Sequence, residues 1–182
     1  MAIFAASFTV AQSADCTTLT FTDTSNYNTI ASPSANENSI AISSFDSRQF
    51  IISDSNYDVI DTISLTGSVL TGSYAISADA WLSVSLSATN VSPARDYSDT
   101  HSVLSTCFLE LCFAELVAET ECGCGGSCGG ACGCDNAQSD KVLLLQFIRA
   151  AQIFSEYSNP VLAQKQLDAG TAICNANSNN SN

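Results

Sequence analysis

Apolar and polar side chains alternate along the N-terminal half of the chain with the period of two that is typical of β-strands. Thr18–Thr22 places its apolar residues on one side and its threonines on the other, and Leu82–Ser87 repeats this pattern with serine. Further short segments rich in β-branched or aromatic residues lie between turn residues, at Ser39–Ser43, Arg48–Ser53, Val59–Thr66 and Ser73–Ser77. Together with a first strand expected within Met1–Ala14, these segments predict a small antiparallel β-sandwich.

The spacing becomes helical near residue 102. Leu104, Phe108 and Leu111 recur at intervals of three or four in a run rich in Leu, Ala and Glu, which predicts a helix over residues 102–120. A second helix is predicted from Gln138 to Tyr157. Its apolar stripe consists of Leu144, Phe147, Ile148 and Ala151.

Ser158-Asn159-Pro160 ends the second helix and begins a third, because Asn159 is a favoured N-cap and Pro160 suits the first helical position. One face of the third helix holds Ala163, Leu167, Gly170 and Cys174. The two helices are therefore expected to form an αα-hairpin with Cys174 pointing inward.

These patterns predict an α+β protein with two domains. Residues 1–99 are expected to form the β-sandwich, and residues 100–182 a Cys-rich helical module made of a helix, a Cys/Gly loop and the αα-hairpin. Asn90–Asp96 is expected to be the linker between them, and the Asn-rich end, Asn175–Asn182, is expected to be a disordered tail.

Five of the nine cysteines lie within Cys122–Cys134, where only glycine, serine and alanine separate them. So much glycine disfavours both helix and strand, so a bound metal or disulfides must hold this loop. Zinc takes four thiolates in a tetrahedron, and glycine permits the tight turns this requires. A structural zinc site is favoured, with local disulfides and free thiols as alternatives. The candidate ligands are Cys122, Cys124, Cys128, Cys132, Cys134 and Cys174.

The remaining cysteines are expected to be structural. Cys107 and Cys112 are five residues apart, which places them ~140° out of alignment on a helix and unsuited to share one ion. They are expected to be buried as small apolar residues, and so is Cys16.

The charge excludes several classes of function. The net charge is −13, with 18 acidic and five basic residues, so there is no basic patch for nucleic acid or for an anionic membrane. No apolar run approaches the ~20 residues of a membrane span. The only histidine, His101, is expected to be exposed in the linker, and no nucleophile elbow is present, so no enzyme is expected.

The segment Asp15-Cys16-Thr17-Thr18-Leu19-Thr20-Phe21-Thr22-Asp23-Thr24-Ser25-Asn26-Tyr27 resembles the opening of small structural proteins of tailed bacteriophages, especially crass-like phages and phages of related gut and marine bacteria. Those proteins are similar to this chain in overall order: a β-sandwich, a helix, a cysteine-dense loop, a helical hairpin and a late cysteine. The resemblance implies a virion component of the neck or tail, present as a ring of copies and assembled in the host cytoplasm. It implies no catalytic residues.

The sequence thus leads to the hypothesis of a non-enzymatic virion structural protein near the head–tail connector, which links other virion proteins and forms a symmetric homo-oligomer. Small domains with limited cores gain stability from such assembly. The alternative is a secreted or cell-surface adhesion module held by disulfides.

Overall fold

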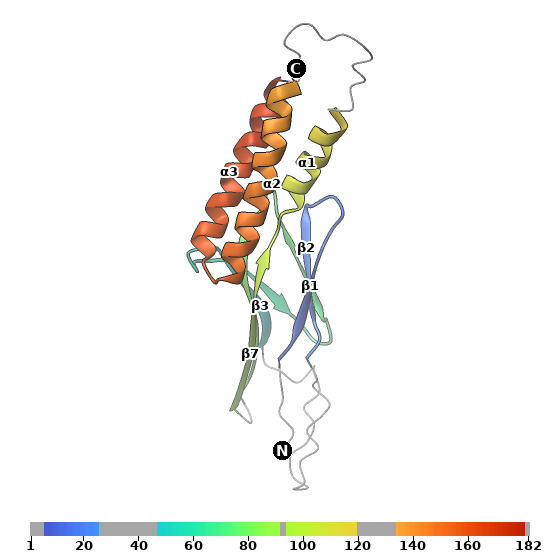
Figure 1. The fold of residues 1–182 in the computed structure, drawn as a ribbon. Helices are drawn as coiled ribbons and strands as arrows, with labels where there is room; N and C mark the ends of the chain where they lie inside the picture. The colour runs from blue at the N-terminus through green and yellow to red at the C-terminus, as the bar shows by residue number, and fades with distance from the viewer. Residues whose placement is uncertain (1–5, 26–46, 92–93, 120–133, 181–182) are drawn as a thin grey trace, which may run out of the picture. The chain divides into compact units, whose positions relative to one another are not determined.

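The computed structural model describes residues 6–25, 47–91, 94–119 and 134–180 (Figure 1). Strands come first and helices follow, so the predicted α+β class is confirmed. The chain divides into two compact units. The first comprises Met1–Ser77 with Leu82–Val103, and the second comprises Ala78–Trp81 with Leu104–Asn182.

The first unit contains two antiparallel sheets. One sheet has the order β1-β2-β5, and its strands are β1 (Phe8–Gln12), β2 (Thr18–Asp23) and β5 (Thr71–Ala75). The other has the order β4-β3-β6-β7, with strands β3 (Ser47–Ser53), β4 (Val59–Leu65), β6 (Trp81–Val91) and β7 (Ala94–Leu104).

Aromatic rings from both sheets meet in the core of this unit. The Phe50 ring of β3 lies with its centroid 5.5 Å from that of Phe8 on β1 and 5.4 Å from that of Phe21 on β2. The alternation predicted for Thr18–Thr22 is present, since Leu19 and Phe21 are buried. Facing sheets that interdigitate in this way form a β-sandwich.

The hairpins β1–β2 and β3–β4 turn through residues with positive φ, Cys16 at 64° and Tyr57 at 67°. In each turn the amide of this residue donates to the carbonyl three positions earlier, Ser13 or Asp54. Glycine usually occupies such a left-handed position. Tyr57 adopts it with an exposed ring.

The expected linker is not a separate segment. Asn90 and Val91 end β6, residues 94–96 begin β7, and His101 lies on β7. In β6 the alternation of Ser and Thr with apolar residues continues to Thr89, beyond the predicted strand, and β7 was not predicted as a strand. The strand predicted at Ser39–Ser43 lies outside the described residues.

The second unit contains the helices α1 (Cys107–Glu119), α2 (Cys134–Glu156) and α3 (Pro160–Asn180). α2 and α3 form the predicted hairpin (Figure 1). The chain reverses at Ser158 with φ 55°, where the amide of Asn159 donates to the carbonyl of Phe154. This is the pattern of a Schellman C-cap. Asn159 then caps α3 through its Oδ1, which accepts from the amide of Leu162 at 3.2 Å.

The core of this unit is formed by one stripe from each helix. Its buried members are Leu109, Leu116, Leu144, Ile148, Ala151 and Leu167. Gly170 lets the helices approach closely, because a Cβ there would lie 3.0 Å from Cδ1 of Leu109 and 3.3 Å from Cδ1 of Leu144. Leu111, expected in the stripe of α1, is exposed, and Leu109 takes the core position.

Three boundaries differ from the prediction. The unit boundary falls after Val103, and the first helix begins at Cys107, because residues up to Leu104 continue β7. Residues 175–180, expected in the disordered tail, continue α3, where the hydroxyl of Ser178 donates to the carbonyl of Cys174. Trp81, the first residue of β6, belongs to the helical unit.

Candidate functional site

The predicted ligand set is only partly described by the structure. Residues 120–133, which hold Cys122, Cys124, Cys128 and Cys132, lie outside the described residues. Cys134 begins α2, but its side chain is not among those described. Of the six candidates, only Cys174 has a described environment.

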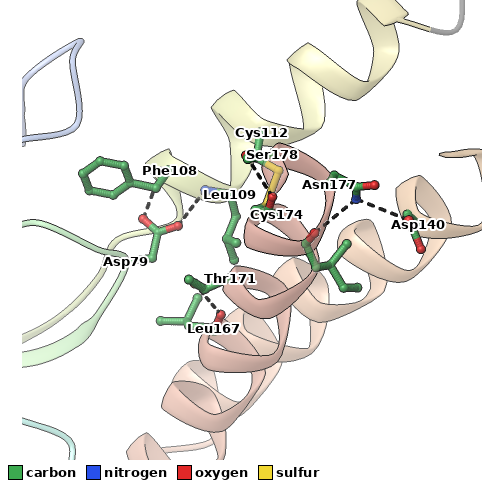
Figure 2. The surroundings of a disulfide bond; sticks show 11 residues. Asp79, Phe108, Leu109, Cys112, Asp140, Leu167, Thr171, Cys174, Asn177 and Ser178 are labelled. Atoms are coloured by element: carbon green, nitrogen blue, oxygen red, sulfur yellow. Dashed lines mark hydrogen bonds between the residues drawn. A yellow bond between two sulfur atoms is a disulfide. The ribbon is translucent and has the colours of Figure 1, made fainter. Parts of the chain in front are cut away.

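Cys174 forms a disulfide with Cys112 that joins α3 to α1 across a sequence separation of 62 (Figure 2). The two Cα atoms are 6.1 Å apart, within the range that natural disulfides span. Both residues pack against the core of the helical unit. Cys174 faces inward as predicted, but as half of a disulfide.

The expected structural zinc is therefore corrected. Cys16 and Cys107 are disulfide-bonded too, so all four cysteines with described side chains are oxidised. Within the described ranges, no three side chains of His, Cys, Asp or Glu gather closely enough to hold a metal ion. A disulfide sulfur is no longer a thiolate, which is the form that binds zinc.

The expectation that Cys16, Cys107 and Cys112 are merely small apolar residues is also wrong. Cys16 is fully buried, as expected, yet bonded. The angle between Cys107 and Cys112 on one helix does not predict their partners, because Cys112 is bonded to Cys174 of another helix.

Polar side chains near the disulfide form hydrogen bonds within α3 and between α3 and α2 (Figure 2). Asn177 donates through Nδ2 to the carbonyl of Ile173 at 3.1 Å and to the Asp140 carboxylate of α2 at 3.3 Å. The hydroxyl of Thr171 donates to the carbonyl of Leu167. The bond between Asn177 and Asp140 connects the Asn-rich end of α3 to α2.

A buried carboxylate caps the N-terminal end of α1. Asp79 accepts through Oδ2 from the amide of Leu109 at 2.7 Å and through Oδ1 from the amide of Phe108 (Figure 2). Oδ1 also accepts from the hydroxyl of Ser105 at 2.9 Å. The first amides of a helix lack intrahelical partners, and an anion there also meets the positive end of the helix dipole. Asp79 thus serves as the N-cap of α1 from a distant position in the chain.

Asp79 belongs to the segment Ala78–Trp81, which also contacts the helical hairpin through Trp81. The indole Nε1 donates to the hydroxyl of Ser155 at 3.1 Å, and the Trp81 amide donates to Oε1 of Gln164 at 2.9 Å. Ala78–Trp81 therefore contacts all three helices of its unit through hydrogen bonds or capping.

The described part of the resemblance motif, residues 15–25, contributes to the sandwich. Asp23 forms a buried ion pair with Arg48, in which Nη1 of Arg48 lies 3.0 Å from Oδ2 of Asp23. The side chain of Asp23 is 0% exposed and that of Arg48 is 2% exposed. Arg48 also donates to the carbonyls of Gly67 and Val69.

The carboxylate of Asp15 is exposed and accepts hydrogen bonds in the turn before β2. The bond from the Ser13 hydroxyl, with smaller contributions from Thr17, holds the pKa of Asp15 below its usual value.

His101 lies on β7 and not in a linker. Its Nε2 is 2.8 Å from Oδ2 of Asp99, and its ring stacks on Phe8 with centroids 4.3 Å apart. The carboxylate and the aromatic ring orient the imidazole. No nucleophile is hydrogen-bonded to this imidazole among the interactions that the structure describes.

The role of Asp79 was not predicted from the sequence. A weak signal existed, since Asp79 precedes the buried Trp81 and Leu82 directly, but its target amides are about thirty positions away. Such a cap is specified by tertiary folding, and local capping rules do not reach it.

The chain matches no protein-family model, no curated protein and no solved structure. Among the described helices, none has the length and apolar character needed to cross a bilayer.

Proposed function

We propose that the protein is a non-enzymatic structural component of a virion, in the neck or tail of a tailed phage, where it links other virion proteins. The observation that carries this proposal is that charged and thiol side chains, which could act in catalysis or ligand binding, are bonded to other parts of the fold. Asp23 pairs with Arg48, Asp79 caps α1, and Cys112 is bonded to Cys174. Groups engaged in this way stabilise the fold and are not available to a substrate.

The resemblance at residues 15–27 supports the same proposal. Cys16 is bonded, Phe21 is in the core and Asp23 is in the buried ion pair, so these three matching positions stabilise the sandwich. A motif that specifies a fold favours a shared architecture with the phage proteins, and the virion role follows from that architecture by analogy.

Both units offer apolar surface to neighbours. On the sandwich, Tyr57, Val59 and Ile60 are exposed at the tip of the β3–β4 hairpin, and on the helical unit Val142 and Ile153 are exposed on α2. Exposed apolar side chains that gather in one region favour protein contacts.

Oxidised cysteines fit a virion, because disulfides persist in particles outside the reducing cytosol. The same disulfides favour a second candidate, a secreted or cell-surface adhesion module. The two candidates differ in where the protein accumulates.

Quantitative mass spectrometry of gradient-purified particles tests the proposal. We expect peptides of this chain at a fixed copy number per particle, in constant ratio to the major capsid protein through the gradient. A host cytosolic protein followed in the same fractions serves as the contamination control. Absence from particles overturns the virion role, and accumulation in the medium or on cells then supports the adhesion module.

A further inference from the structure

The outward face of α2 carries apolar side chains where a solvated helix usually carries charge. Val142 and Ile153 are 49% and 50% exposed, and Tyr157, which directly follows α2, is 80% exposed. At ~100° per residue these positions lie opposite the buried stripe that contains Leu144 and Ala151. We call this surface the α2 outer row, made of Val142, Gln146, Arg149, Ile153, Glu156 and Tyr157.

The charge of the α2 outer row distinguishes it from the rest of the chain. The whole chain has a net charge of −13, yet the row holds one cation, Arg149, and one anion, Glu156. Two copies of so acidic a chain repel each other across most of their surface, so self-association needs a face without net charge. The exposed apolar residue Leu111 of α1 shows the contrast, since Glu110 and Glu115 flank it.

The positions of the two charges fit a two-fold contact. Arg149 and Glu156 are seven residues apart, which places them on one side of α2 and ~10 Å apart along its axis. When two α2 helices lie antiparallel, with Arg149 of each opposite Glu156 of the other, the midpoint falls beside Ile153. Both ion pairs then form at once, and the two Ile153 side chains meet at the centre.

We propose that the α2 outer row from Gln146 to Tyr157 is the surface through which two copies of this chain associate, antiparallel, about a two-fold axis beside Ile153. In this register Val142 lies beyond the end of the partner's α2. This inference deepens the proposed function, on which it rests, because it names one partner of the structural protein as a second copy of itself. Tyr157 of each copy adds apolar area near Gln146 of the other. The contact is isologous, so it closes as a dimer, and a larger ring requires a further, different contact.

Sedimentation velocity and light scattering of the oxidised full-length protein test this proposal. We expect about 38 kDa, twice the chain mass of 19.0 kDa. Ile153→Asp places a carboxylate at the centre and is expected to raise the dimer dissociation constant at least about tenfold, as at interface hot spots. Leu111→Asp is the matched control, since Leu111 is similarly exposed, at 46%, on α1 and should leave the dimer intact.

Charge exchange tests the register. Arg149→Glu and Glu156→Arg each create two like-charge contacts and are expected to weaken the dimer, whereas the double exchange is expected to restore it to within about threefold. Circular dichroism verifies that each variant is folded. A monomeric wild-type protein, a dimer insensitive to Ile153→Asp, or a double exchange that fails to restore association overturns the proposal.

These outcomes are distinct from failure of the virion role. A monomer in solution that is found in particles overturns only the α2 contact. A dimer that is absent from particles overturns only the virion role.

Discussion

Buried charged side chains of this protein are satisfied by specific partners at the residue scale. Asp79 receives three hydrogen bonds at the start of α1, and Arg48 donates to one carboxylate and two carbonyls in the sandwich. An unpaired polar group inside a protein costs more than a made hydrogen bond contributes. Removing one member of such a set therefore leaves several others without partners.

Asp79→Ala is expected to lower the free energy of unfolding by about 2–4 kcal/mol, because two amides and a hydroxyl lose their buried acceptor. Asp79→Asn keeps one acceptor oxygen and should cost less. Urea unfolding followed by circular dichroism measures both. Asp168→Ala is the control, since its bond to Gln164 is exposed and its loss should cost under about 0.5 kcal/mol. Equal stability of Asp79→Ala and the wild type would show that the cap contributes nothing.

Arg48→Met is expected to destabilise the sandwich by about 3–5 kcal/mol, because it leaves the Asp23 carboxylate buried without a counter-charge. Lys165→Met, at an exposed position of α3, removes the same kind of charge and should have little effect. Tyrosine fluorescence and far-UV circular dichroism in a urea titration report the difference, because Tyr57 and Tyr74 lie in the sandwich whereas the single tryptophan, Trp81, belongs to the helical unit. A stability loss no larger than that of Lys165→Met would contradict the role of the ion pair.

At the scale of elements, the helical unit combines a hairpin with a covalent connection. α2 and α3 are joined by a tight capped turn and therefore pair through local sequence. α1 is separated from them by the cysteine-rich segment and is held by the disulfide, by Asp79 and by packing at Gly170. The disulfide restricts the unfolded chain most where the closed loop is long.

Cys112→Ala with Cys174→Ala is expected to lower the free energy of unfolding of the helical unit by about 2–4 kcal/mol, since the lost cross-link spans 62 residues. Denaturant unfolding monitored by helical circular dichroism measures the change. A non-reducing peptide map supplies the control, in which the wild-type Cys112 peptide is covalently joined to the Cys174 peptide. Unchanged stability in the double variant would mean that packing alone places α1.

At the scale of the whole molecule, stability is expected to depend on the oxidation of the cysteines and not on a bound metal. The four cysteines with described side chains are disulfide-bonded, so the fold depends on oxidation at these positions. A protein organised in this way keeps its full stability outside the reducing cytosol.

Reduction of the full chain is expected to lower its thermal midpoint by roughly 10 °C or more, because the unfolded chain gains entropy. A strong chelator under oxidising conditions should leave the midpoint unchanged. Scanning calorimetry of the same preparation with reductant, with chelator and with neither gives the comparison. A midpoint that falls with chelator and not with reductant would reverse this assignment.

Local patterns in the chain were sufficient for much of the fold. Period-two alternation predicted β2 and the first part of β6, and Asn159-Pro160 predicted the start of α3, because strand alternation and helix capping depend on residues within a few positions of one another. The prediction failed where a partner is distant. It assigned residues 102–104 to a helix, although the pairing of β7 in a sheet determines their extended form.

The amino-acid order alone specified that strands precede helices, the buried face of β2, the helical hairpin and the acidic charge. Tertiary structure decided which cysteine meets which and which amides Asp79 caps, since Cys112 finds Cys174 only when α1 packs on α3. The reason is physical: hydrophobic periodicity is written in neighbouring residues, whereas a disulfide or a remote cap requires two segments to be brought within a few ångströms by the packing of everything between them.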